Sequence, residues 1–237
     1  MPLTPRLAVL ATLTLITLIG PVPGQPPAAK AADKDKDGWK KLFDGKSLDG
    51  WKASDFFGSG KVHVKDGAIV METGSSMTGI TYAGKDFPRI DYEVTFEAKK
   101  IAGRDFFCTT TFPVGEDYCS FVVGGWGGTT VGLSSIDSED ASSNETSKSK
   151  EFNRDQWYRV RLRISKPKIE AWIDDEKMVD LETADRRISI RLECRASCPF
   201  GLCTWETSGA VRDLRLRQLT EADKKAVVSP KKPGENK

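Results

Sequence analysis

Charged side chains that could take part in acid–base chemistry stand on several segments that alternate between apolar and charged residues. A carboxylate can act as the base of such a reaction, and a guanidinium can stabilise the oxyanion that forms. The candidates for catalytic roles are Glu97, Glu193, Arg104 and Arg195. The alternative is a row of ion pairs on a solvated face. We favour this alternative for a set of outward-pointing arginines, namely Arg159, Arg161, Arg163, Arg215 and Arg217.

Two tryptophans could form the walls of a sugar site. The C–H face of a sugar packs on an aromatic plane, and tryptophan offers the largest plane together with an N–H donor. Trp126 lies between two glycine pairs, which let the backbone approach a ligand closely. We therefore predict a substrate-binding site that contains Trp126, Trp205, Glu206 and Asp105. For Trp205 the alternative is burial at the end of the fold.

The sequence assigns no metal ligand. Asp137, Glu139 and Asp140 could offer hard oxygen atoms to calcium, but they lack EF-hand spacing. His63 is the sole histidine, and its pKa range suits a catalytic base, although an exposed strand histidine without a partner is the commoner situation. The cofactor is therefore left unknown, with a divalent cation kept as an alternative.

The chain contains five cysteines, and three of them are close together in sequence. Cys194, Cys198 and Cys203 flank a turn at Pro199 and Gly201, so we expect one disulfide among them. Their spacing fits no common structural zinc pattern, so a disulfide or buried thiols are favoured over zinc. No bridge is expected between the other two cysteines.

Alternation with a period of two residues is the dominant pattern. It predicts strands at 91–98, 157–164 and 187–195, and a last strand that turns Leu214 and Leu216 inward. No convincing helical period occurs within the domain, and Asp-Gly pairs stand where tight turns are expected. Many short strands with turn signals favour an all-β fold, a two-sheet antiparallel β-sandwich.

The first 31 residues are typical of a signal peptide. Arg6 supplies the positive charge near its start, an apolar run extends from 7 to 19, and Ala29-Lys30-Ala31 offers a cleavage site. The run is shorter than the ~20 residues of a membrane span, and a retained anchor is the alternative. We expect an exported protein, periplasmic or extracellular, with no stable membrane span after signal removal.

The remaining chain divides into three parts. A flexible leader is predicted at 32–38, one large β domain at 39–219, and a disordered charged tail at 220–237. The formal net charge is only +2, from 36 basic and 34 acidic residues. Because no basic block with interleaved aromatic residues stands in the domain, we expect no nucleic-acid partner.

Several short motifs in a fixed order resemble one family. They are FDGKSLDGW at 43–51, VKDG at 64–67, DYEV at 91–94, WYRV at 157–160, AWID at 171–174 and VRDLRL at 211–216. Together they resemble the 3-keto-disaccharide hydrolase domain, over 39–219. The resemblance implies a concanavalin A-like jelly roll with one concave sheet. It also implies an activity on glycosides with a ketone at carbon 3, by proton abstraction at carbon 2 and elimination.

Two positions depart from the pattern of that family. Arg104-Asp105-Phe106-Phe107 stands where many relatives carry Asn-Ser-Gly, and Ala171 stands where many carry a histidine. The sequence therefore predicts a domain that binds or acts on a saccharide or glycoside, with a hydrolase-type enzyme as the leading interpretation. The alternatives are a carbohydrate-binding module without catalysis and a structural envelope protein.

Overall fold

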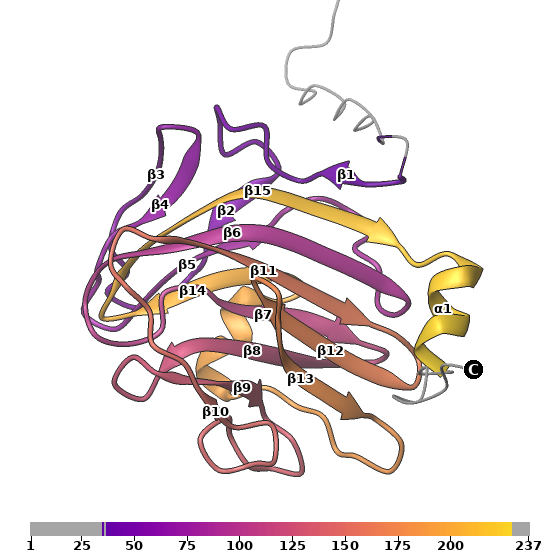
Figure 1. Ribbon diagram of the computed structural model, residues 1–237. Helices are drawn as coiled ribbons and strands as arrows, with labels where there is room; N and C mark the ends of the chain where they lie inside the picture. Colours follow the sequence, from indigo (N-terminus) through magenta and orange to yellow (C-terminus); the bar gives the residue numbers. More distant parts are fainter. Residues whose placement is uncertain (1–34, 36, 229–237) are drawn as a thin grey trace, which may run out of the picture. The chain divides into compact units, whose positions relative to one another are not determined.

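Two antiparallel sheets stack face to face in the computed structural model, which describes residue 35 and residues 37–228 (Figure 1). Sheet A has eight strands and sheet B has seven. In sheet A the strands are, in spatial order, β13 (Glu176–Glu182), β12 (Lys168–Ile173), β11 (Trp157–Ile164), β6 (Tyr92–Ala102), β15 (Ser208–Gln218), β4 (Ala68–Met71) and β3 (Val62–Lys65), with β1 (Lys40–Lys41) also paired to β15. In sheet B they are β10 (Lys148–Ser149), β9 (Thr130–Ser134), β8 (Asp117–Gly125), β7 (Thr109–Val114), β14 (Gly201–Trp205), β5 (Met77–Tyr82) and β2 (Trp51–Ala53).

The core lies between the sheets and follows the predicted alternation. In β6 the inward side chains of Tyr92, Val94, Phe96 and Ala98 are at most 1% exposed. The facing strands of sheet B contribute large apolar side chains at every second position, among them Phe112, Phe121 and Leu133, which are fully buried. Each such side chain stabilises the fold by roughly 1.5–3 kcal/mol. The predicted two-sheet sandwich is confirmed.

One predicted strand is wrong. Residues 187–195 do not form a strand, and Leu192–Ser197 form the 3-10 helix η1. Ser189 exchanges two backbone hydrogen bonds with Ser135, and Arg187 accepts one from Asp137, but these contacts form an isolated bridge and no strand. In a strand, Leu192 would point inward together with Ile188 and Cys194. In the structure Leu192 is 77% exposed, whereas Ile188 and Cys194 are buried. The segment contacts β5 and β14 instead of joining a sheet, so its alternation reflects a few separate packing contacts.

A helix stands where the sequence predicted a disordered tail. Helix α1 covers Glu221–Val228 and follows β15 at one end of the sandwich (Figure 1). Thr220 and Asp223 form a reciprocal cap, in which each backbone N–H donates to the other side chain. The rest of the predicted tail, the signal peptide and most of the leader lie outside the described residues. In the part of the chain that is described, no helix has the length and apolar character needed to cross a membrane.

The expected disulfide is not formed. All five cysteines are free thiols, and four of them are buried. Cys194 and Cys203 pack with Met77 in a small apolar cluster, where they act as small hydrophobic side chains. Burial raises the pKa of the Cys119 thiol to about 12, which makes this thiol unreactive at neutral pH.

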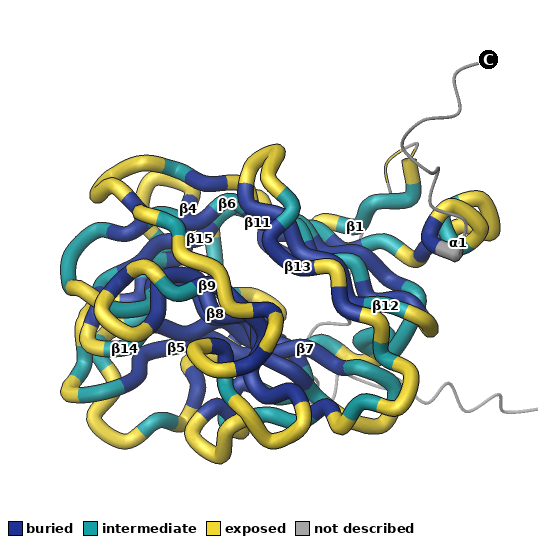
Figure 2. Tube along the Cα trace, turned by 60° about the horizontal axis from the view of Figure 1, so that its bottom comes forward, coloured by how far each residue is buried: buried dark blue, intermediate teal, exposed yellow. Residues whose placement is uncertain are grey.

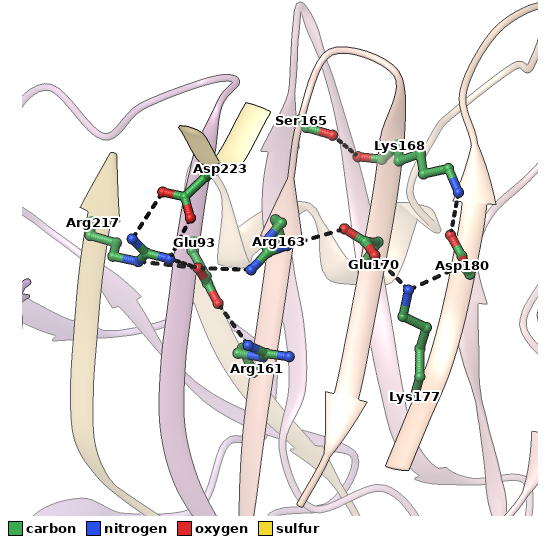
Figure 3. A network of polar contacts seen from close by, with 10 residues as sticks. All are labelled: Glu93, Arg161, Arg163, Ser165, Lys168, Glu170, Lys177, Asp180, Arg217 and Asp223. Carbon is green, nitrogen blue, oxygen red and sulfur yellow. Dashed lines mark hydrogen bonds and ion pairs between the residues drawn. The ribbon is translucent and has the colours of Figure 1, made fainter. Parts of the chain in front are cut away.

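The outer face of sheet A carries a connected network of ion pairs (Figure 3). At its centre Glu93 is only 1% exposed and faces three arginines from neighbouring strands. Its carboxylate lies 2.5 Å from Arg217, 3.5 Å from Arg161 and 3.6 Å from Arg163. Arg161 also lies over the ring of Trp172, at 3.8 Å from the centroid. The predicted ion-pair role of these arginines is confirmed, although the pairs are more buried than a solvated face implies.

Replacing Glu93 should destabilise the fold strongly. In Glu93→Gln three guanidinium groups lose their shared carboxylate, and removal of one partner from a buried ion pair costs about 3 kcal/mol or more. Equilibrium urea denaturation measures the loss in the free energy of unfolding.

Glu97→Gln is the matched control for this change, because Glu97 lies on the same strand and face. Its side chain is 35% exposed, and among the described residues Arg212 is its one ion-pair partner, so the expected loss is below about 1 kcal/mol. Equal losses in the two variants would show that the Glu93 network does not stabilise the fold as described.

Candidate functional site

A hollow of about 190 Å³ opens on the outer face of sheet B. Its floor consists of outward side chains whose strand neighbours point into the core. In Figure 2 the strands of this sheet are mostly buried and lie between exposed loops. The floor residues are Met77, Thr109, Ser120, Val122 and Ser134. The hollow is therefore the second face of the strands that build the core.

Four segments of the chain form the rim of the hollow. The loop after β6 contributes Asp105 and Phe106, the turn after β8 contributes Trp126, and β14 ends in Trp205. The rings of Phe106 and Trp205 lie 6.3 Å apart between centroids. The segment that begins η1 adds a last set of rim residues, namely Arg191, Glu193 and Cys194.

Trp126 occupies an unusual backbone conformation. Its φ is 49°, in the left-handed region, which costs a bulky residue on the order of 1–3 kcal/mol. The ring is nonetheless 44% exposed beside the hollow. Asp105 holds the turn, because its carboxylate accepts hydrogen bonds from the N–H groups of Phe106 (2.8 Å) and Gly127 (3.1 Å). Asp105 thus positions Trp126 as well as lining the hollow.

An arginine links two carboxylates at the opposite rim. Arg191 donates hydrogen bonds to Glu193 (3.0 Å) and to Asp140 (3.1 Å). The bond from Arg191 lowers the pKa of Glu193 below its ordinary value, and the same bond raises the pKa of Arg191. Glu193 is therefore ionised at neutral pH and offers acceptor oxygens at the rim.

Two hydroxyl groups in the floor have no hydrogen-bond partner within the described part of the chain. They are Thr109 Oγ1 and Ser134 Oγ, on residues that are each 1% exposed. Ser120, between them in the floor, is satisfied by Thr111 at 2.9 Å. A buried polar group left without a partner costs about 1–3 kcal/mol. Both oxygen atoms lie just beneath the surface of the floor, so a ligand hydroxyl would reach them by displacing the atoms that cover them.

The structure brings four of the eight predicted site residues together. Trp126, Trp205, Asp105 and Glu193 all line the hollow. Glu193 reaches it from η1, not from the strand that the sequence predicted.

The other four predicted residues lie elsewhere. Glu97 belongs to β6 of sheet A, so it points away from sheet B and pairs with Arg212 at 2.6 Å. Arg195 lies on the exposed side of η1, next to the buried Cys194. Glu206 is exposed in the turn after β14, and Arg104 lies in a separate depression. Alternation predicts that a residue points outward but does not predict from which of the two sheets it points, and residues of different sheets lie on opposite outer faces.

Several residues of the hollow were missed in the sequence, among them Arg191, Thr109 and Ser134. A signal was present for the hydroxyl groups, since strands with large apolar residues on one side carry only small polar ones on the other. No pattern in the sequence indicated Arg191, because its position depends on how the irregular segment crosses sheet B.

The remaining sequence candidates are occupied by other contacts. His63 Nδ1 lies 3.5 Å from Glu72, on β3 of sheet A. Asp137 accepts a hydrogen bond from the Arg187 N–H and pairs with Arg186 at 3.1 Å. Within residues 37–228, histidine, cysteine and acidic side chains form no group suited to a metal ion.

The rim pair predicts a specific pH dependence. Because the folded-state pKa of Glu193 is depressed, its contribution to stability is present above its ordinary value near 4.5 and is lost as the pH falls through the lower folded-state value. In Arg191→Gln the pKa of Glu193 should lie closer to its ordinary value. Less stability should therefore be lost below pH 4.5. NMR titration of the Glu193 carboxyl carbon measures the pKa directly. The control is Arg187→Gln, because the side chain of Arg187 donates to Ser138 and pairs with no carboxylate of the described residues; an equal change there would contradict the assignment.

Solved structures with similar folds include several sugar-related proteins. The Crh5 transglycosylase in complex with NAG has a TM-score of 0.54 and 13% identity, over 77% of this chain and 85% of that one. The carbohydrate recognition domain of Emp46p has a TM-score of 0.51 and 11% identity, over 73% and 90%. A Bacillus subtilis protein of unknown function with a galectin-like fold has a TM-score of 0.50 and 10% identity, over 72% and 90%. At these identities the similarity is one of fold.

Sequence comparison identifies the family. No curated protein matches the chain. Residues 38–217, most of the chain, match the model of the 3-keto-alpha-glucoside-1,2-lyase-like domain, which confirms the resemblance inferred from the motifs. The chain therefore belongs to the 3-keto-alpha-glucoside-1,2-lyase-like domain family.

Proposed function

We propose that the hollow on sheet B binds a saccharide. The single observation that carries this proposal is the convergence of two tryptophans and an ionised carboxylate on one concave surface, above two hydroxyls without a partner in the described part of the chain. Indole planes suit the C–H faces of a sugar, while the polar groups suit its hydroxyls. Membership of the family supports a saccharide-related function.

The size of the hollow suggests how much of the ligand it holds. At about 190 Å³ it is smaller than the ~300–1,000 Å³ of common drug-sized ligand pockets. One pyranose unit would occupy it, with its hydroxyls near Thr109 and Ser134. A second unit would extend past the exposed ring of Trp126 into solvent.

We further propose that the ligand is a 3-keto-glycoside and that Glu193 is the base. The ketone acidifies the proton on carbon 2, and Glu193 would remove it while the electron pair moves to the carbon 3 oxygen. Arg191 would stabilise that oxyanion. Collapse of the enolate would break the bond to the carbon 1 substituent, which would leave as an alcohol after taking the proton back from Glu193. Water would then add across the carbon 1–carbon 2 double bond.

Turnover of a 3-keto-disaccharide tests this chemistry. Glu193→Gln should lower kcat by about 10²-fold or more, the usual contribution of a general base. Chromatographic detection of the released monosaccharides provides the measurement. Glu97→Gln is the control and should retain activity, because Glu97 lies on the outer face of sheet A. Unchanged turnover in Glu193→Gln would rule out this residue as the base.

Saccharide binding without cleavage is the second candidate. Two observations favour it: Glu193 is tied to Arg191, which weakens it as a base, and residues 104–107 depart from the family pattern. Calorimetry with neutral sugars and 3-keto-sugars separates the candidates. Heat of binding that is lost in Trp126→Ala, without turnover in the wild type, would support a binding module. Absence of both would support a structural role.

We also propose that the protein is exported after cleavage behind Ala31. The basis is the charged start, the apolar run and the small residues that follow it. N-terminal sequencing of the protein secreted by a bacterial host should give Ala32 as the first residue. Retention of residues 1–31 would indicate a membrane anchor instead.

A further inference from the structure

A lysine stands at a core-facing position of β6. The strand turns Tyr92, Val94, Phe96 and Ala98 into the core, and the next residue in that series is Lys100. Lys100 is 9% exposed, and within the described residues its ammonium group has neither a hydrogen-bond acceptor nor a carboxylate within ion-pair distance. Its stem is therefore buried, while its ammonium group reaches solvent at the edge of the core.

The ammonium group of Lys100 faces a depression that contains two more cations. Arg104 and Arg154 line it as well, and neither is paired with a carboxylate in the part of the chain that the structure describes. Glu151 is the one acid among the lining residues, and it makes no ion pair there. Three positive charges against one negative charge leave the depression with an excess of positive charge.

The positive charges at this depression repel one another. Burial lowers the pKa of Lys100, and repulsion by Arg154 lowers it further. Snorkelling of the lysine to solvent explains the buried stem. It does not explain why two arginines gather at the same place. Elsewhere in this protein arginines near a buried charge are paired with acids, as around Glu93.

Glycines open the depression to a ligand. Gly103, Gly127 and Gly128 line it without side chains. A Cβ atom on Gly128 would lie 2.8 Å from the Arg104 carbonyl oxygen, which is too close, and 4.0 Å from Lys100 Nζ, so a side chain there would clash with the backbone beside the ammonium group. The backbone is thus kept small beside the cations.

We propose that Lys100, Arg104 and Arg154 form an oxyanion-binding site for a carboxylate, sulfate or phosphate group. Guanidinium and ammonium groups bind such groups by charge-assisted hydrogen bonds. The site adjoins the hollow, since Arg104 precedes Asp105 and Gly127 follows Trp126 in the chain. The oxyanion is therefore assigned to an acidic saccharide whose sugar ring lies in the hollow. This last step rests on the proposed saccharide function, and the anion site itself does not.

Titration with sodium sulfate tests the anion site. Chloride is used to keep the ionic strength constant, and binding is followed by calorimetry and by NMR shifts. We expect saturable sulfate binding that weakens about tenfold or more in Lys100→Met and in Arg154→Gln. The matched control is Lys99→Met, which removes the same charge from the adjacent residue, whose ammonium lies over Trp157. Because Arg154 is exposed, Arg154→Gln should fold even if Lys100→Met does not.

The outcomes separate the two proposals. The anion site would be overturned if sulfate bound no better than chloride. It would also be overturned if Lys99→Met weakened sulfate binding as much as Lys100→Met does. Comparison of glucuronate with glucose then tests the acidic saccharide: glucuronate should bind more tightly, and Lys100→Met should remove only that difference. Equal affinity for the two sugars would leave a site for free oxyanions and reject the saccharide assignment. Trp126→Ala should abolish sugar binding and leave sulfate binding intact. A failure of the saccharide proposal can therefore be distinguished from a failure of the anion-site proposal.

Discussion

Every strand in this sandwich has two faces, and the core occupies only one of them. Burial of the inward side chains forces each alternate residue outward, so each sheet must present a second surface. The two outer surfaces point in opposite directions because the sheets stack face to face. Any site built from outward residues must therefore belong to one sheet alone. This constraint separates Glu97 from Glu193, and with it the ion-pair surface from the hollow.

The two outer surfaces satisfy their polar groups in different ways. On sheet A long charged side chains neutralise one another, and Glu93 shares its carboxylate among three arginines. On sheet B the outward residues are short, and Thr109 and Ser134 keep hydroxyls without partners within the described chain. Short residues leave room, and unpartnered hydroxyls leave hydrogen-bonding capacity. The first surface suits stability and the second suits a ligand.

Irregular segments contribute most of the rim of the hollow. Trp126 stands on a strained turn that Asp105 holds, and Arg191 and Glu193 arrive on a segment that crosses sheet B without joining it. Asn144 supports this rim from below, because its buried amide donates to the carbonyl groups of Leu133, Glu139 and Asp140. The Asp140 side chain in turn holds Arg191. Polar side chains buried in loops thus fix the geometry of the rim.

The sequence by itself determined the strands with clear alternation, the inward residues of β6, β11 and β15, the family, and the aromatic and acidic residues worth considering. These are local properties, because a period of two is visible within a few residues. Only the tertiary structure decided which outward residues meet. It placed Glu97 and Arg195 away from the hollow, turned 187–195 into a loop and a 3-10 helix, and gathered Lys100, Arg104 and Arg154 at one edge. The physical reason is that neighbours on a sheet face are set by long-range strand pairing and by the paths of loops, neither of which leaves a periodic signal in the chain.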